Sequence, residues 1–141
     1  MMFRFMIIAA AVLVSAENAL ANGHGSSSSA PPPPRQEGPP ARAVITQKGP
    51  MLVDLNGMTL YNFERDTSGN KSNCDGKCAE AWIPLSAPAN ATASGDFTVI
   101  IRTDGSKMWA YRYRPLYTSQ ADKSAGDIND IDPAWHIVRP Y

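Results

Sequence analysis

The chain has 141 residues, and its 13 lysine and arginine residues are balanced by 13 aspartate and glutamate residues, so the formal net charge is zero. A protein that neutralises nucleic-acid phosphates needs an excess of basic residues, so this balance argues against nucleic acid as a partner. The length predicts one folded domain, and a content of 43% hydrophobic and 18% charged residues is usual for a globular chain.

The first 21 residues are organised like a secretory signal peptide. Arg4 gives a positive start, residues 5–14 form an apolar stretch too short to cross a bilayer, and Ala19-Leu20-Ala21 is a small-x-small cleavage site. We therefore expect a secreted or periplasmic bacterial protein that is cleaved near Ala21 and has no stable membrane insertion afterwards. No cysteine follows the cleavage site, so a lipid anchor is not expected.

A segment rich in glycine, serine and proline follows, over residues 22–42, and it contains almost nothing that could be buried. This composition is typical of a disordered or polyproline-II linker. The sequence therefore predicts three parts: a signal peptide over 1–21, a linker over 22–42 and a folded domain over 43–141.

Alternating apolar residues on both sides of Asn56-Gly57 predict a first β-hairpin. Asn-Gly is typical of a two-residue type I′ turn, in which both residues have positive φ. Such a turn would place Leu55 opposite Met58 and Val53 opposite Leu60, which gives one nearly apolar face.

A second hairpin is predicted around Asp104-Gly105, between residues 97–103 and 106–113. A two-residue turn there would place Arg102 opposite Lys107. Because two like charges directly opposed are unfavourable, a longer loop is the alternative.

The two halves of the predicted domain repeat the same order of features, which indicates an internal duplication. Each half has a hairpin, a Leu-Tyr pair, an aspartate five residues after the tyrosine, a glycine-containing loop and a tryptophan. The residues are Leu60, Tyr61, Asp66, Gly69 and Trp82 in the first half, and Leu116, Tyr117, Asp122, Gly126 and Trp135 in the second. We expect a mainly β (β-rich α+β) fold in which two related hairpin repeats form one small domain, with a short helix after the cysteine loop.

The two cysteines, Cys74 and Cys78, lie four residues apart with Gly76 between them. In an oxidising compartment this spacing suits a disulfide that holds the loop before Trp82, with a contribution of about 2 kcal/mol from ring closure. The alternative is a thiol-redox or copper site, since thiolates suit Cu(I). Two sulfurs do not complete a metal site, so His136 or a methionine would have to add ligands; otherwise no cofactor is expected.

The aromatic and acidic residues that recur in both halves are the candidate site residues. They are Tyr61, Phe63, Asp66, Trp82, Tyr117, Asp122 and Trp135. One interpretation gives the rings to the core and the aspartates to turn amides, and the other gives the rings to a ligand-binding face and the aspartates to acid-base catalysis. We assign no catalytic residue, because the chain has no nucleophile with a base beside it in a known motif.

The segment Tyr61-Asn62-Phe63-Glu64-Arg65-Asp66 resembles the Y-x-[FWY]-x-x-D signature of a bacterial secreted-repeat family, predicted lipoproteins of unknown function. Residues 74–85 resemble that family's cysteine and tryptophan block, and Pro115-Leu116-Tyr117 with Trp135-His136 resemble its second copy. The chain departs from the family pattern at Ser119, where an aromatic residue is expected, and at Tyr113, where a glycine is usual. The resemblance implies a small secreted bacterial domain and no established reaction.

The function expected from these observations is that of a secreted or periplasmic cell-envelope module with a binding or structural role. Its partner would be an unknown envelope component or a small ligand. The alternative is a thiol-redox or copper-handling accessory protein that uses Cys74 and Cys78.

Overall fold

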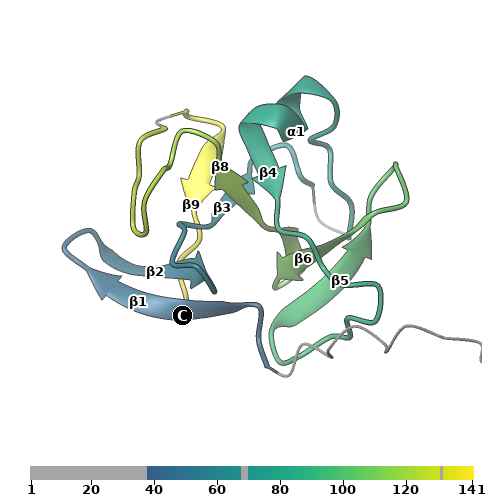
Figure 1. Cartoon of the computed structure of the whole chain (residues 1–141), viewed down its shortest axis with the longest axis horizontal. Coiled ribbons are helices and arrows are strands. Elements are labelled where there is room, and N and C mark those ends of the chain that lie inside the picture. Colours follow the sequence, from purple (N-terminus) through teal and green to yellow (C-terminus); the bar gives the residue numbers. More distant parts are fainter. Residues whose placement is uncertain (1–37, 68–69, 131) are drawn as a thin grey trace, which may run out of the picture. The chain divides into compact units, whose positions relative to one another are not determined.

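The computed structural model of the chain describes residues 38–67, 70–130 and 132–141 (Figure 1). The predicted signal peptide and the predicted linker up to residue 37 lie outside the described residues. The first strand, β1 (Ala41–Thr46), begins two residues before position 43, where the sequence placed the start of the domain, and Ala41 is already buried in the core. Within the described ranges, no helix has the length and apolar character that a membrane span requires.

The architecture is mainly β, as the sequence predicts, with one short helix. The remaining elements are β2 (Gly49–Asp54), β3 (Tyr61–Phe63), α1 (Lys77–Ala81), β4 (Trp82–Pro84), β5 (Phe97–Ile101), β6 (Lys107–Tyr111), β7 (Arg114–Pro115), β8 (Tyr117–Ser119) and β9 (Trp135–Ile137). They form three antiparallel sheets with the strand orders β1-β2, β4-β8-β3-β9 and β5-β6-β7.

The hairpin of β5 and β6 has the longer loop that the sequence left open. Ile101 pairs with Lys107, and the amide of Arg102 donates to the carbonyl of Ser106 over 2.8 Å. Gly105 ends the loop with φ 83°, a left-handed conformation that favours glycine. Arg102 and Lys107 are therefore not directly opposed.

The predicted type I′ turn at Asn56-Gly57 is wrong, because only Gly57 has positive φ, at 85°. Val53 bridges Thr59 instead of Leu60, so the register is displaced by one residue. The cause is Asp54, whose Oδ1 accepts hydrogen bonds from the amides of Asn56 (2.8 Å) and Met58 (2.9 Å) and so stabilises a longer loop.

The hairpin that does form in the first repeat pairs β1 with β2, through a turn at Gln47 and Lys48. The sequence assigned the first two residues of β1 to the linker. As a result, β1 and β2 correspond in order to β5 and β6 of the second repeat, and each repeat contributes one hairpin.

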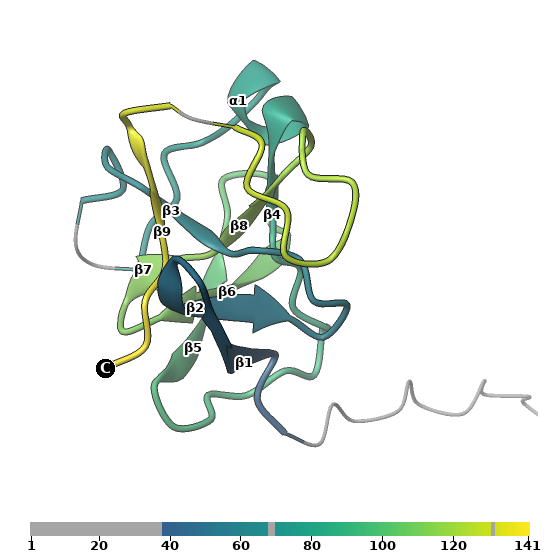
Figure 2. The same ribbon diagram turned by 90° about the vertical axis from the view of Figure 1, so that its left-hand side faces the viewer.

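The four-stranded sheet joins the two repeats by exchanging their last strands. The central strands β3 and β8 pair at Tyr61 and Tyr117. The last strand of the first repeat, β4, pairs with β8 of the second, and the last strand of the second repeat, β9, pairs with β3 of the first. Figure 2 shows β9 beside β3 and β4 beside β8. Neither repeat can complete this sheet alone.

The core contains two clusters of buried side chains. One cluster is aromatic and lies on the inner face of the four-stranded sheet; its buried members are Tyr61, Phe63, Cys74, Trp82, Ile100, Met108, Ala110, Tyr117 and Trp135. The other joins the hairpins of both repeats and contains Ala41, Leu52, Leu60, Phe97, Trp109, Tyr111, Leu116 and Val138. Since both clusters draw on both repeats, the two halves share their core.

Candidate functional site

The motif tyrosines and aspartates form two crossed pairs between the repeats. Tyr61 of the first repeat donates from its hydroxyl to Oδ2 of Asp122 in the second, over 2.8 Å. Tyr117 of the second repeat donates to Oδ2 of Asp66 in the first, over 2.7 Å. All four residues are buried. The motif therefore links each repeat to the other.

The second oxygen of each aspartate accepts a backbone amide seven residues further along its own loop. Oδ1 of Asp66 accepts from the amide of Asn73, and Oδ1 of Asp122 accepts from the amide of Asn129, both over 2.7 Å. The sequence interpretation that gave the aspartates to turn amides is therefore seen in the geometry. The sequence analysis did not single out the two asparagines, although each follows its aspartate by seven residues, and this repeat of the spacing could have indicated them.

Burial changes the acidity of the crossed pairs. The pKa of both Tyr61 and Tyr117 is raised well above its ordinary value, first by burial and then by the carboxylate that each hydroxyl faces, although the Ser72 hydroxyl opposes the rise at Tyr117. Burial also raises the pKa of Asp66, against the opposing effects of the Asn73 amide, the Tyr117 hydroxyl and the Arg114 charge. The tyrosines thus stay neutral donors over a wide pH range.

The motif rings stack on one another inside the domain. Trp82 and Trp135 lie parallel with ring centroids 4.1 Å apart, and Phe63 stacks on Trp135 at 4.4 Å. Ser119, where the family pattern has an aromatic residue, pairs with Trp82, and its hydroxyl donates to Asp130 over 3.3 Å. These rings are at most 8% exposed and pack mainly into the core, and Tyr61 and Trp135 also line a surface pocket of about 330 Å³.

Cys74 and Cys78 form a disulfide, with their Cα atoms 5.2 Å apart, around the start of α1. The side chain of Arg102, from the second repeat, donates to the carbonyl of Cys74 over 2.8 Å and to Asp75 over 3.0 Å. His136 lies exposed on β9. In the described ranges, no three histidine, cysteine or acidic side chains are grouped so that they could hold a metal ion.

The outer face of the four-stranded sheet carries a groove of about 350 Å³. Side chains alternate between faces along a strand, so Asn62 and its cross-strand partner His136 point away from the aromatic core. The lining residues are Asn62, Tyr111, Arg112, Arg114, His136, Ile137, Val138, Arg139 and Tyr141. Three arginines and a histidine therefore lie around a groove that has no acidic side chain in its lining; we call it the basic groove.

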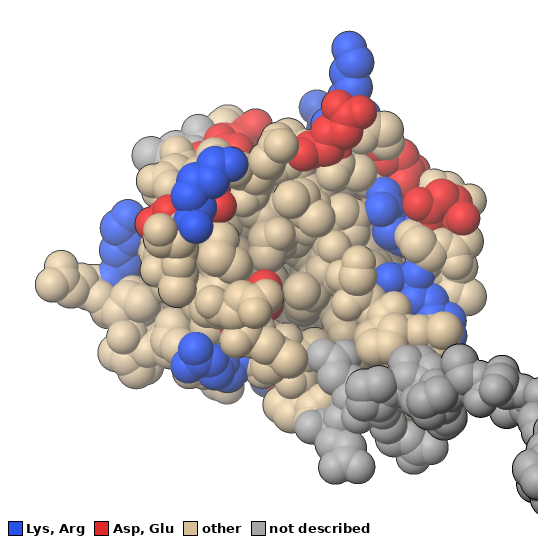
Figure 3. All heavy atoms as spheres, in the orientation of Figure 1, with Lys and Arg blue, Asp and Glu red and all other residues tan. Residues whose placement is uncertain are grey.

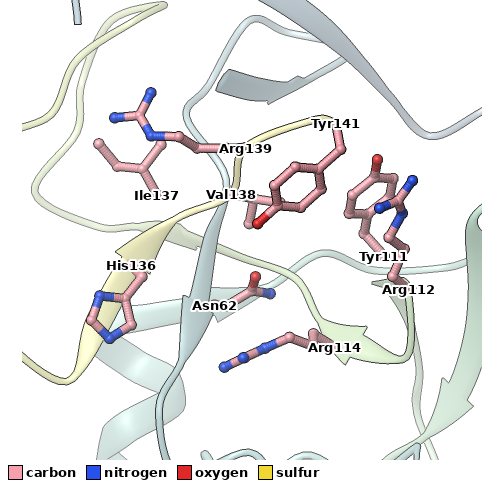
Figure 4. Close-up of a pocket in the computed structure, with 9 residues that line it drawn as sticks. All are labelled: Asn62, Tyr111, Arg112, Arg114, His136, Ile137, Val138, Arg139 and Tyr141. Atoms are coloured by element: carbon pink, nitrogen blue, oxygen red, sulfur yellow. The ribbon is translucent and has the colours of Figure 1, made fainter. Parts of the chain in front are cut away.

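Figure 4 shows how the basic side chains are placed. Arg114 extends beneath Asn62 toward His136, while Arg112 lies at the other end, against Tyr111. Arg139 points away from the centre, and its Nη1 donates to the carbonyls of Lys48 (2.9 Å) and Pro50 (2.8 Å). Arg114 and His136 thus lie beside Asn62, and Arg139 binds the hairpin of β1 and β2.

Of the residues that the sequence singled out as candidates, only His136 lines the basic groove. The arginines were missed because they come from the turn after β6, from β7 and from the segment after β9, and only the strand exchange brings these together. Elsewhere the charges are mixed: on the face shown in Figure 3, basic and acidic side chains are interspersed without a large area of one sign.

Comparison with known proteins supports the duplication. A family model described as "Secreted repeat of unknown function" matches residues 42–86 and again residues 98–139. A search of curated proteins found no match, and a search of solved structures found none either. The two matched ranges coincide with the two halves that exchange strands and share the crossed tyrosine-aspartate pairs, and together they cover more than half of the chain. The chain therefore belongs to this family of secreted repeats of unknown function, of which it contains two copies.

Proposed function

We propose that this protein is a non-catalytic binding module of the bacterial cell envelope, and that it binds its partner in the basic groove. One observation carries the proposal. The motif rings are packed into the core on the inner face of the sheet, whereas the outer face carries an open groove lined by polar and charged groups. The inner face thus forms the scaffold, and the outer face offers the groove to a partner.

Secretion is part of the proposal. The family is one of secreted repeats, and the N-terminal 21 residues have the composition of a signal peptide. N-terminal sequencing of the exported protein should place its first residue close to Asn22. Recovery of exported protein that still carries residues 1–21 in a membrane fraction would contradict this.

Retention on envelope material tests the binding function. The exported protein is incubated with a sedimentable cell-wall and membrane preparation of the source bacterium, and the bound fraction is measured. His136→Trp, which fills the groove from β9, should abolish retention. Ile83→Trp is the matched control, because Ile83 is 45% exposed on the same face at the opposite edge strand, β4, and it should leave retention unchanged.

If both variants are retained as well as the wild type, at equal thermal stability, the groove is not the binding surface. Loss of retention in both would mean that the outer face as a whole, rather than the groove, makes the contact.

The thiol-redox or copper function is the second candidate. Its support is that Cys78 is only partly buried, so one sulfur of the disulfide lies near the surface. Reduced protein should then bind one equivalent of Cu(I), and a variant with serine at both positions should bind none. The absence of such copper binding would leave the disulfide with a structural role only.

A further inference from the structure

We infer that the basic groove holds an acidic sugar unit of an envelope polysaccharide, with its carboxylate or phosphate group between Arg114 and His136 beside Asn62. This inference rests on the proposed function and names the chemistry of its ligand.

The first argument is the charge of the groove. In the described part of the chain, neither Arg114 nor His136 forms an ion pair. The only hydrogen bond that the Arg114 guanidinium donates there is a long one, of 3.5 Å, to the carbonyl of Phe63. A guanidinium presents several donors in a fixed plane that fits the oxygens of a carboxylate or phosphate. A guanidinium without an ion-pair partner, with an imidazole beside it, therefore favours an oxyanion from outside the protein, whereas Asp130 and Asp132 line the adjoining pocket that His136 also borders.

The second argument is the strained turn at the other end of the groove. Arg112 and Tyr113 form the connection from β6 to β7 with φ values of 49° and 65°, although neither is glycine. Left-handed conformations of this kind cost free energy and tend to occur where function requires them. Here the turn places the Arg112 guanidinium near the rings of Tyr111 and Tyr141, at 5.5 and 5.3 Å from their centroids.

Arg112 also contacts Asp96, but only over 3.3 Å and between side chains that are about half exposed. Such a surface ion pair is weak. Arg112 therefore keeps most of its capacity for a ligand anion, while the tyrosine rings fix its position.

The third argument is the neutral part of the lining. The side-chain amide of Asn62 donates to the carbonyl of Pro115 over 2.7 Å, and its oxygen accepts no hydrogen bond within the described residues. That oxygen is available to a hydroxyl group of the ligand. Tyr141, which is 95% exposed, offers a ring face at the rim. A ligand that fits these groups has an oxyanion, a hydroxyl group and a flat apolar face, and an acidic sugar has all three.

The size of the groove agrees with a single ligand unit. A volume of about 350 Å³ lies at the lower end of the range for small-molecule sites, about 300–1,000 Å³. It is open along the surface, so a unit within a longer chain can enter it. Nucleic acid is disfavoured by the zero net charge of the chain.

Calorimetry and fluorescence titration on the exported protein test the inference with four defined probes. Oligogalacturonate carries carboxylates on sugar rings, phosphorylated oligomannose carries phosphates, unmodified oligomannose carries no charge, and inorganic phosphate carries no ring. One of the two acidic oligosaccharides should bind at least about tenfold more tightly than unmodified oligomannose and than inorganic phosphate. Added salt should weaken this binding.

Variants locate the site. Arg114→Gln and His136→Gln should each weaken binding of the preferred acidic oligosaccharide by about tenfold or more, because the first removes the guanidinium and the second removes the imidazole that face the anion. Arg65→Gln removes an equal charge from an exposed position outside the groove and should change nothing. Thermal denaturation of each variant shows that it is folded.

Three results would overturn the inference. They are equal affinity for neutral and acidic oligosaccharides, binding that Arg65→Gln weakens as much as Arg114→Gln does, and no binding of either acidic oligosaccharide. If envelope retention is still abolished by His136→Trp in any of these cases, the proposed function stands and only the ligand class is wrong.

Discussion

The crossed tyrosine-aspartate pairs make a quantitative prediction for Tyr117→Phe. The hydroxyl of Tyr117 donates to Asp66 over 2.7 Å and lies 2.7 Å from the hydroxyl of Ser72, and both partners are at most 4% exposed. A hydrogen bond to a charged group contributes about 1.5–3 kcal/mol and a neutral one about 0.5–1.5 kcal/mol. Phenylalanine keeps the ring packing, so we expect the free energy of unfolding to fall by about 2–4 kcal/mol.

The assay is chemical and thermal denaturation at pH 7. In a domain of this size about 1 kcal/mol corresponds to about 4–8 °C in Tm, so the transition should fall by at least about 8 °C. Tyr113→Phe, at a 61% exposed side chain, is the control and should change the free energy by no more than about 0.5 kcal/mol. The deficit of Tyr117→Phe should shrink as the pH falls through the raised pKa of Asp66, because the protonated carboxyl carries no buried charge that needs a donor at Oδ2. An equal effect of both substitutions, or a deficit that does not depend on pH, would refute the reasoning.

Three further predictions concern the turns, the disulfide and alkaline pH. Gly57→Ala should destabilise the domain by at least about 1 kcal/mol more than Gly105→Ala: both glycines have positive φ, but a Cβ at position 57 would lie 2.9 Å from a neighbouring Cβ, whereas position 105 is open. Replacing Cys74 and Cys78 together with serine should cost about 2 kcal/mol in unfolding experiments, the value of ring closure. The contribution of the two buried tyrosines to stability should be constant up to the ordinary tyrosine pKa of 10.0 and fall above it, because their raised pKa favours the protonated, folded state; a series of Tm values at alkaline pH measures this.

Each of these predictions has a result that contradicts it. Equal costs at Gly57 and Gly105 would show that the neighbouring chain yields to a new methyl group. A serine double variant as stable as the wild type would mean that the loop is held by Arg102 without the disulfide. An alkaline decline that persists unchanged in a variant with phenylalanine at both buried tyrosines would have to come from other groups.

The duplication was readable from the sequence because it depends on residue types at equal spacings. A tyrosine, an aspartate five residues later and a tryptophan recur in both halves; in the structure each tyrosine binds the aspartate of the other half, and the two tryptophans stack on each other. The crossing of the pairs was not readable, since spacing within a repeat says nothing about which repeat supplies the partner.

The turns show why the hairpin register was harder to predict. Asn56-Gly57 by itself favours a tight turn, but the Asp54 side chain competes for the loop amides and shifts the register by one residue. Conversely, the turn with two positive φ values occurs at Arg112 and Tyr113. Neither residue is a glycine or an asparagine, so the sequence does not predict a turn of this type there. The basic groove was equally hard to predict, because the positions of its arginines are set by that turn and by the strand exchange.

The order in which the strands appear along the chain limits when the protein can fold. β3 is made early, but its neighbours β8 and β9 come from the second repeat, and β9 lies only a few residues from position 141. A chain that passes through an export channel from its N-terminus cannot close the central sheet until residue 137 has emerged.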